Sequence, residues 1–489
     1  KQMLISGNFL DIRFGDTPRY VQPAGIYWLQ AAATLPFGGA AAPIWAYRIP
    51  SMIGALASVL LLAWFGTRVV SPNVALAAAF LLATSVGFAT EAHFAKIDSM
   101  LLAVTILAQA SLYYCLTSPR QNFIGWPLSF WLALAGGALL KGPVIAVVSA
   151  LTAIGFVVWS RKPRTLLNLR PLMGVPVLLA IILPWLYAVN LETHGEFLKV
   201  AIGDSIGGKL AGTSDRHAGP PGYHLALLVL TFFPGIAAAG LGAAYAIINR
   251  RDQLTRFLIC WIVPAWIFFE LVPTKLPHYV LPLFPAIALL SAIGLRNAAA
   301  LRKRALGRWL HRVAGALFLI VAAAVAVLPF YAVRKLGGEI GFAEWAACAG
   351  AVALGLAGIA LWLRPSAERL VPMFAAMLLI FVALFEFIAP SLDALWASDR
   401  VAHYLKSYSG CAEIKLATAG YAEPSNLFHF GPKTLQTGGA GAAQFLAGEQ
   451  TCGIAVVEDA QRAAFDAAAG AAGVSVRSLG RLTGFNYVK

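Results

Sequence analysis

Long apolar runs, separated by short polar stretches, make up most of the chain. A helix needs about 20 mainly apolar residues to cross a bilayer. The run 127–160 is too long for one span and is interrupted at Lys141-Gly142-Pro143, so we interpret it as two helices. The other runs of spanning length lie at 49–70, 74–90, 99–117, 171–190, 223–248, 255–272, 279–295, 310–332, 342–363 and 369–389. The pattern predicts an all-α polytopic membrane protein with about twelve spans.

Composition supports this class. Of the 489 residues, 59% are hydrophobic and 12% are charged, whereas soluble globular domains contain about 25% charged residues. The net charge of +15 would suggest nucleic-acid binding in a soluble protein. In a membrane protein the distribution of basic residues instead reports topology, and we expect no nucleic-acid partner.

The predicted loops fall into two alternating sets that differ in charge. One set, which includes 161–170, 296–312 and 364–369, contains seventeen Lys and Arg residues, and the other set contains eight. The positive-inside rule places the first set in the cytoplasm. Residues 1–48 and those after about 390 are then expected outside the cytoplasm, on the side where the loops mix acids, bases and histidines.

Three regions are predicted. Residues 1–48 contain amphipathic stretches without a span, which fits an outer loop with interfacial helices. Because the chain opens with Lys1 and not with Met, a preceding N-terminal span is expected to be missing. Residues 49–389 form the transmembrane domain, and residues 390–489 form a small α/β domain.

The α/β domain is predicted from short apolar runs with polar breaks. We expect strands in "CAEIKLATAGY", "CGIAVVED" and "GVSVRSLGRL", and helices in "SDRVAHYLKSY" and "EDAQRAAFDAAAGAAG". Cys411 and Cys452 both fall here and can pair as a disulfide if the domain lies in an oxidising compartment. A supporting or recognition role is expected, because no phosphate loop or nucleophile elbow occurs in it.

Polar residues suited to binding a lipid phosphate gather in the outer loops. Cations hold phosphate, and a helix broken by glycine and proline leaves backbone groups free for an anion. Asp98 immediately precedes a predicted span and can orient a substrate or a cation. The binding candidates are Lys96, Lys141, Arg216, His217, Lys275, His278 and Tyr279.

Each candidate also has a purely structural interpretation. Lys96 can extend its charged end to the membrane surface, and Asp98 can cap the free amides of a first helical turn. Lys141 can belong to a plain reversal loop, and a lone histidine is more often structural than a ligand.

Several motifs resemble one known group. The stretch "MLISGNFLDIRFGDTPRYVQPAGIYWLQAAATLPFG" resembles the first outer loop of GT-C glycosyltransferases of the bacterial lipid A aminoarabinose transferase and protein O-mannosyltransferase group. Similar to that group's later motifs, in the same order, are "HFAKIDSMLLA", "LLKGPV", "DRHAGPPGYH", "TKLPHYVLPLFPAIALL" and "AGYAEPSNLFHFG". The resemblance covers essentially the whole chain.

The resemblance implies a GT-C fold with thirteen spans in the bacterial inner membrane, of which about twelve are present here. It implies a periplasmic active site and a periplasmic C-terminal domain. It also implies transfer of a sugar, with inversion, from a polyprenyl-phosphate donor to lipid A, another glycolipid, or serine and threonine of a protein.

The resemblance also assigns roles to residues. The main catalytic acid of the group precedes the "MLISG" stretch, so it is expected upstream of Lys1. Gln22 stands where the group often has a phosphate-binding lysine, and with Tyr27 it completes the substrate-binding candidates. The cations would stabilise the leaving phosphate. A divalent metal is compatible with this chemistry, but the sequence shows no clear ligand set, so no cofactor is assigned.

Two other classes remain open. A transporter or flippase for a lipid-linked sugar would place polar groups or broken helices at mid-membrane, whereas Glu270 and Glu386 lie near the outer ends of their spans. A structural membrane subunit with a periplasmic binding domain would not need the dense polar clusters of the outer loops.

Overall fold

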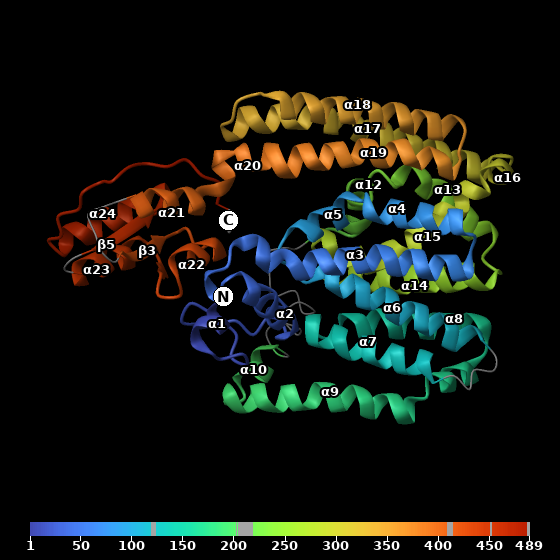
Figure 1. The fold of residues 1–489 in the computed structure, drawn as a ribbon, viewed down its shortest axis with the longest axis horizontal. Coiled ribbons are helices and arrows are strands. Elements are labelled where there is room, and N and C mark those ends of the chain that lie inside the picture. The colour runs from blue at the N-terminus through green and yellow to red at the C-terminus, as the bar shows by residue number, and fades with distance from the viewer. Residues whose placement is uncertain (119–123, 202, 204–218, 408–413, 450–451, 487–489) are drawn as a thin grey trace. The chain divides into compact units, whose positions relative to one another are not determined.

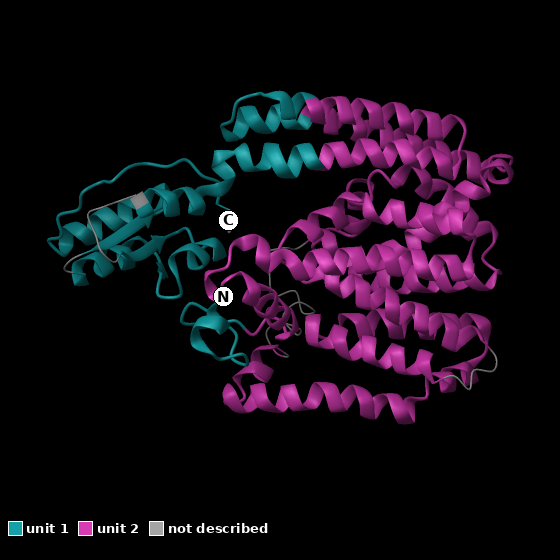
Figure 2. Cartoon of the chain, in the orientation of Figure 1, with its two compact units in different colours: residues 1–19, 328–345, 382–489 teal, residues 20–327, 346–381 magenta. Residues whose placement is uncertain are grey.

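The computed structural model describes all residues except 119–123, 202, 204–218, 408–413, 450–451 and 487–489 (Figure 1). The chain divides into two compact units (Figure 2), each of which is described by itself. Unit 1 comprises residues 1–19, 328–345 and 382–489, and unit 2 comprises residues 20–327 and 346–381.

Unit 2 is a bundle of apolar helices. Three long helices contribute residues to both units: α17 (Ala305–Leu336), α18 (Phe342–Leu363) and α19 (Leu370–Val382). The other α-helices of the bundle are α2 (Gly25–Thr34), α3 (Ile44–Val69), α4 (Pro72–Ala83), α5 (Val86–His93), α6 (Asp98–Thr117), α7 (Gly125–Lys141), α8 (Val144–Ser160), α9 (Pro171–Glu192), α10 (Glu196–Leu198), α12 (Tyr223–Thr231), α13 (Ile236–Ile248), α14 (Gln253–Leu271), α15 (Phe284–Arg296) and α16 (Ala298–Arg302). The 3₁₀ segments η6 (Pro277–Leu283) and η7 (Ala367–Arg369) precede α15 and α19.

Every predicted apolar run is helical, but several runs are broken. Among the described residues, eight helical segments are long and apolar enough to cross a membrane, and a ninth arises if α4 and α5, bent by 61°, count as one span. About twelve spans were predicted. The difference arises because α7 and α8 have 17 residues each on either side of Gly142-Pro143, and because the predicted span 223–248 is divided between α12 and α13 at Pro234.

Small residues bring the helices of unit 2 close together, as in other membrane bundles. A Cβ atom on Gly54 of α3 would lie 2.5 Å from the backbone nitrogen of Met100 on α6. A Cβ atom on Gly25 of α2 would lie 2.5 Å from the carbonyl oxygen of Leu139 on α7. These contacts fix the beginning of α6 and the end of α7 against α3 and α2.

A single buried tryptophan anchors η6 to the core. The Trp261 side chain on α14 is fully buried, and its Nε1–H donates to the carbonyl oxygen of Pro282 at 3.0 Å. Proline at 277 and 282 cannot donate a backbone hydrogen bond, so the chain at η6 stays 3₁₀ before α15 begins. The turn that carries His278 and Tyr279 is thereby held against the bundle.

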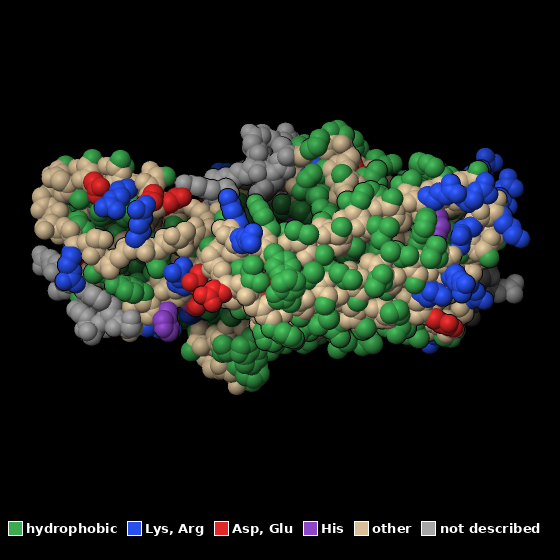
Figure 3. All heavy atoms as spheres, turned by 90° about the horizontal axis from the view of Figure 1, so that it is seen from above, with side chains coloured by type: hydrophobic (Ala, Val, Ile, Leu, Met, Phe, Trp, Pro, Cys, Tyr) green, Lys and Arg blue, Asp and Glu red, His purple; other side chains and the backbone are tan. Residues whose placement is uncertain are grey.

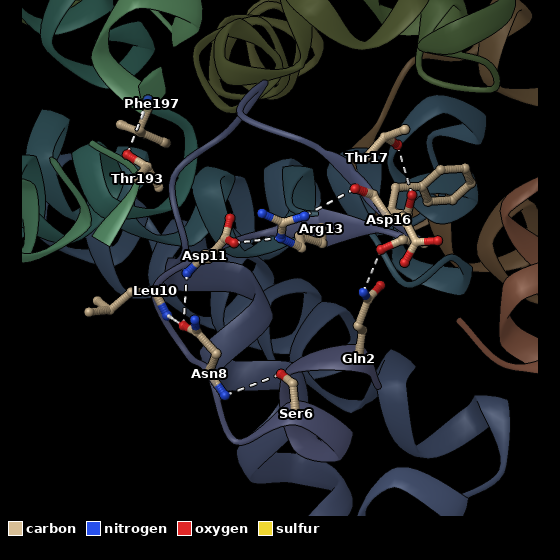
Figure 4. A network of polar contacts seen from close by, with 12 residues as sticks. Gln2, Ser6, Asn8, Leu10, Asp11, Arg13, Asp16, Thr17, Thr193 and Phe197 are labelled. Carbon is tan, nitrogen blue, oxygen red and sulfur yellow. Dashed lines mark hydrogen bonds and ion pairs between the residues drawn. The ribbon is translucent and has the colours of Figure 1, made fainter. Parts of the chain in front are cut away.

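The first 19 residues belong to unit 1 and are ordered by local polar contacts (Figure 4). They contain α1 (Gln2–Ser6) and the short antiparallel pair β1 (Arg13–Phe14) and β2 (Thr17–Pro18). The Asn8 side chain accepts from the backbone N–H groups of Leu10 and Asp11, each at 3.0 Å. The Arg13 guanidinium lies 2.5 Å from the Asp11 carboxylate and donates to the Asp16 carbonyl at 3.0 Å.

The rest of unit 1 contains the small α/β domain, which confirms that prediction. Three parallel strands have the order β4-β3-β5. The elements are α21 (Ala397–Ser407), β3 (Lys415–Ala419), α22 (Pro424–Phe430), β4 (Leu435–Thr437), α23 (Gly439–Gly448), β5 (Gly453–Val457) and α24 (Arg462–Ala471). Two of the predicted strands are confirmed as β3 and β5.

The strand predicted in "GVSVRSLGRL" is wrong, and the third strand is β4, which has three residues. Residues 474–486 have no strand pairing, and side chains of α21 bond to two of their backbone carbonyls. The Tyr404 hydroxyl donates to the Leu479 carbonyl at 2.8 Å, and the Arg400 guanidinium donates to the Thr483 carbonyl at 3.2 Å. Cys452 is disulfide-bonded, and Cys411, its predicted partner, lies outside the described residues.

The motif "AGYAEPSNLFHFG" forms a buried polar network after β3. Glu423 accepts from the hydroxyls of Tyr421 and Ser425, each at 2.9 Å. The Ser398 hydroxyl on α21 donates to the side-chain oxygen of Asn426 at 2.8 Å and lies 2.8 Å from the Tyr421 hydroxyl. Burial raises the pKa of Tyr421, so the phenol stays protonated and donates. The network joins the turn to α21.

Candidate active site

Ionisable side chains from five segments meet at one end of the unit 2 bundle. The segments are the end of α5, residues 94–97, the first residue of α6, the last residue of α7, and η6. Gly142 ends α7 with a φ of 65°, a conformation that glycine adopts at little cost. The chain therefore turns directly after Lys141 and leaves that side chain at the helix end.

Asp98 and Lys141 form the central ion pair of the site. The Lys141 Nζ atom lies 2.5 Å from Asp98 Oδ1, and the two side chains are 16% and 9% exposed. Asp98 is the first residue of α6 and Lys141 the last of α7. A carboxylate at a helix N-terminus and an ammonium at a C-terminus each interact favourably with the helix dipole. The pair is therefore stabilised from both helices.

Glu91 is a buried carboxylate that joins two more of the predicted residues. Its Oε1 atom accepts from the Lys96 ammonium at 3.1 Å and lies 3.7 Å from His278 Nδ1. The Glu91 side chain is 7% exposed, and its Oε2 atom is buried with no hydrogen-bond partner in the structure. An unpaired carboxylate oxygen at such a position is available to a ligand that brings a donor.

Aromatic rings form one wall of the site around Tyr279. The Lys141 ammonium lies 5.9 Å from the centre of the Tyr279 ring. The rings of His278, Phe269 and His224 lie 5.3, 6.4 and 6.5 Å from it. The Phe269 and His224 rings are buried, so the partly exposed rings of Tyr279 and His278 are the ones that can contact the apolar face of a sugar or a lipid chain while the cations bind an anionic group.

Lys275 is buried beside a different partner. Its side chain is 5% exposed, and its ammonium donates to the Gly219 carbonyl at 2.9 Å. His224 lies five residues after Gly219, and its ring is buried. The Nδ1 atom of this ring lies 3.6 Å from Glu270 Oε1, and its Nε2 atom lies 3.3 Å from the Leu276 carbonyl. Lys275 thus holds the segment at Gly219 against the turn before η6.

The structure brings together five of the eight sequence candidates that lie among the described residues. Asp98, Lys141, Lys96, His278 and Tyr279 form the cluster described above, whereas Lys275 lies against Gly219. Gln22 and Tyr27 are half-buried, Gln22 just before α2 and Tyr27 within it. Arg216 and His217 lie outside the described residues. The functional roles assigned to all of these residues stay predictions.

Two acidic residues of this region were not among the candidates. From the sequence, Glu270 is named only as an acid near a span end, and Glu91 is not singled out. In the sequence, Glu91 could have been selected by its position five residues before Lys96, near the end of the predicted run 74–90. Among the described residues, no group of three or more His, Cys, Asp and Glu side chains is placed to hold a metal ion.

A buried serine fixes the segment that carries Lys96. The Ser51 hydroxyl on α3 accepts from the Lys96 backbone N–H at 3.1 Å and donates to the Lys96 carbonyl at 2.7 Å. We expect Ser51→Ala to cost about 1–3 kcal/mol of stability, because it removes both hydrogen bonds of a buried hydroxyl to the Lys96 backbone, although the Lys96 N–H keeps its bond to the Phe94 carbonyl. Thermal unfolding in detergent measures this. The matched control is Thr67→Ala on the same helix, whose exposed hydroxyl bonds only within α3, and equal losses in both variants would contradict the assignment.

Comparison with known proteins shows which proteins the chain is similar to. A family described as dolichyl-phosphate-mannose-protein mannosyltransferase matches residues 19–195. The undecaprenyl phosphate-alpha-4-amino-4-deoxy-L-arabinose arabinosyl transferase of Pseudomonas aeruginosa (strain UCBPP-PA14) is 28% identical over 390 residues, which cover 77% of this chain and 68% of that protein. Over about three quarters of its length, the chain is thus similar to aminoarabinose transferases. The resemblance inferred from the ordered motifs is confirmed.

Solved structures show the same fold. The crystal structure of ArnT from Cupriavidus metallidurans bound to undecaprenyl phosphate has a TM-score of 0.72 and 18% identity, and the match covers 89% of this chain and 79% of that chain. The apo structure of the same protein has a TM-score of 0.71 at 18% identity and covers 95% of this chain and 88% of that chain. The predicted GT-C fold is thereby confirmed.

Proposed function

We propose that this protein is a membrane glycosyltransferase that moves a sugar from a polyprenyl-phosphate donor to lipid A or another glycolipid of the cell envelope. The observation that carries the proposal is the cluster of Lys141, Lys96 and His278 at the end of an apolar bundle, each facing a buried carboxylate. A donor of this class has an apolar tail and an anionic phosphate, and the bundle end offers surfaces for both. The names of the relatives supply the donor class.

In the proposed reaction, an acceptor oxygen forms a bond to the anomeric carbon of the sugar. The bond from that carbon to the phosphate oxygen breaks, and the electron pair leaves with the polyprenyl phosphate. Negative charge develops on the leaving phosphate, and preorganised cations stabilise such charge strongly in a water-poor site. Lys141 and Lys96 are placed for this role, with Lys275 and Arg216 as further candidates.

Asp98 acts as a positioning residue in this proposal. Its carboxylate holds the Lys141 ammonium until the donor phosphate enters and competes for it. An acceptor hydroxyl would lose its proton to a carboxylate base, whereas an acceptor phosphate, as on lipid A, already carries a nucleophilic oxygen. Single displacement at the anomeric carbon gives inversion.

The orientation belongs to the same proposal. The distribution of Lys and Arg between alternate loops supports a site on the periplasmic face of the inner membrane, with residues 390–489 on that side. The disulfide at Cys452 is in keeping with an oxidising compartment. Residues 1–48 would form the first periplasmic loop and residues 49–389 the transmembrane domain.

A second candidate is transfer to serine or threonine of a protein, which is favoured by the mannosyltransferase family that matches residues 19–195. The donor sugar would then be a hexose, and the acceptor hydroxyl would need a base. A third candidate, transport of a lipid-linked sugar, would move the donor across the membrane without breaking the bond at its anomeric carbon.

Radiolabelled donors test the proposal. Membranes that contain the full-length protein are incubated with undecaprenyl phosphate carrying labelled aminoarabinose or labelled mannose, and the label is followed. We expect aminoarabinose label to appear in lipid A. Label in protein would establish the second candidate, and label that changes sides while still attached to undecaprenyl phosphate would establish transport.

A further inference from the structure

A basic pocket lies at the end of unit 2 that is opposite to the candidate active site. It has a volume of about 550 Å³ and lies between α16, the end of α18, and η7. Arg302, Arg364 and Arg369 line it, together with Glu368. We call this hollow the arginine pocket. His278 and Tyr279 of the active site lie at the beginning of the span Pro277–Arg296, and the pocket follows the end of that span, so about 30 Å of helix separates the two sites.

Two of the three arginines are fixed in place by backbone carbonyls. Arg302 donates through Nη1 to the Leu363 carbonyl at 3.0 Å, and Arg369 donates through Nη1 to the Ala360 carbonyl at 3.3 Å. Both carbonyls belong to the last turn of α18, where cations are favoured by the helix dipole. A guanidinium has five N–H donors, so both arginines retain donors for another group.

The pocket has an excess of positive charge. Three arginines face one glutamate, and none of the ion pairs found among the described residues includes these four side chains. Further Lys and Arg side chains gather at the end of the bundle that carries α16 (Figure 3). A guanidinium matches the geometry of phosphate oxygens and binds them with two parallel hydrogen bonds.

Apolar surface adjoins the arginines on the membrane side. Leu363 ends one candidate span and lines the pocket, and Val371 lies in the next span. Both side chains are 56% exposed. Trp362, beside Leu363, is partly exposed and has its ring 6.2 Å from that of His311. Tryptophan at a span end is typical of the depth of lipid headgroups.

We propose that the arginine pocket binds the phosphate of an anionic phospholipid, with the acyl chains along Leu363 and Val371. The shared chemistry, a phosphate held by guanidinium groups, would also suit free inorganic phosphate, but the exposed apolar side chains beside the pocket favour a lipid. Basic pockets between membrane helices commonly bind such headgroups. The bound lipid would join the end of α18 to the beginning of α19.

The test measures lipid binding by the full chain in a neutral detergent. Native mass spectrometry follows a titration with phosphatidylglycerol and, separately, with phosphatidylcholine of the same acyl chains. We expect phosphatidylglycerol to bind at least tenfold more tightly, and Arg364→Gln to remove most of that preference. Arg364 is the cleanest position, because Arg302 and Arg369 also hold the end of α18.

Three controls make the result decisive. Arg250→Gln removes an exposed arginine from another loop and is expected to leave the lipid preference unchanged, and Arg364→Lys is expected to give an intermediate affinity. Thermal unfolding checks that each variant is folded. Equal binding of the two lipids, equal loss in Arg250→Gln and Arg364→Gln, or full displacement of the lipid by millimolar inorganic phosphate would overturn the proposal.

Discussion

Replacement of Lys141 by methionine is expected to lower kcat for sugar transfer about 10²–10³-fold, which is the usual cost of removing one group that stabilises a developing negative charge. Methionine keeps most of the length of the side chain and removes its charge. The ammonium lies at the centre of the cluster, 2.5 Å from Asp98 and 5.9 Å from the Tyr279 ring centre. Among the described residues, the nearby Lys96 ammonium is paired with Glu91 instead, so we do not expect it to replace the lost charge. The rate is measured with labelled donor under saturating conditions.

The same replacement also threatens the fold, and a double variant separates the two effects. Lys141→Met leaves the Asp98 carboxylate, which is 9% exposed, without its partner, and removal of one partner of a buried pair costs about 3–5 kcal/mol. Replacement of both partners by apolar residues is often neutral or stabilising. We therefore expect Asp98→Leu with Lys141→Met to recover the melting temperature of the parent protein but not its activity.

Two further variants define what would contradict this prediction. Lys141→Arg keeps the charge and should retain part of the activity. Lys162→Met removes an exposed cation from a different loop and should leave kcat unchanged. If the double variant regains transfer together with stability, Lys141 serves the fold and not the leaving phosphate.

Much of the helical plan follows from the sequence because each apolar run is a local property. The break at Gly142-Pro143 was predicted from residues that end helices, whereas the break at Pro234 was not, because 223–248 was predicted as one span. Their consequence, that the segments on either side fall short of a full span, depends on where each helix begins and ends in three dimensions. The three-residue strand β4 could not be found for a similar reason, since pairing with β3 defines it and no apolar alternation marks it.

The candidate site was predictable in its members but not in its pairing. Lys96 and Asp98 are two residues apart, and both were selected from the sequence. Asp98 nevertheless pairs with Lys141, which lies 43 positions further along the chain, while Lys96 pairs with Glu91. Such pairings depend on how α6 and α7 pack, which no local pattern records. Lys275 shows the reverse case. A lysine between two apolar runs suggested contact with a ligand, whereas in the structure its ammonium donates to the Gly219 carbonyl.

The packing that creates the site depends on one small residue, and Gly54→Val is expected to destabilise the protein by about 3 kcal/mol or more. A Cβ atom at this position would lie 2.5 Å from the backbone nitrogen of Met100 and 2.6 Å from its Cα atom. Both are backbone atoms of α6, so no side chain can rotate away. The helices must separate, and overpacking of this kind costs several kcal/mol when the backbone has to move.

The separation would also disturb the active site, because the same helix pair positions it. The Ser58 hydroxyl on α3 bonds to the Ser99 carbonyl at 3.2 Å, and Asp98 immediately precedes Ser99. Thermal unfolding and the yield of monodisperse protein measure the effect of Gly54→Val. The matched control is Gly136→Val on α7, where a Cβ atom would meet nothing within 4 Å and the change is expected to stay within about 1 kcal/mol. A normal melting temperature for Gly54→Val would show that α3 and α6 do not approach at this point, and the position assigned to Asp98 would then be wrong as well.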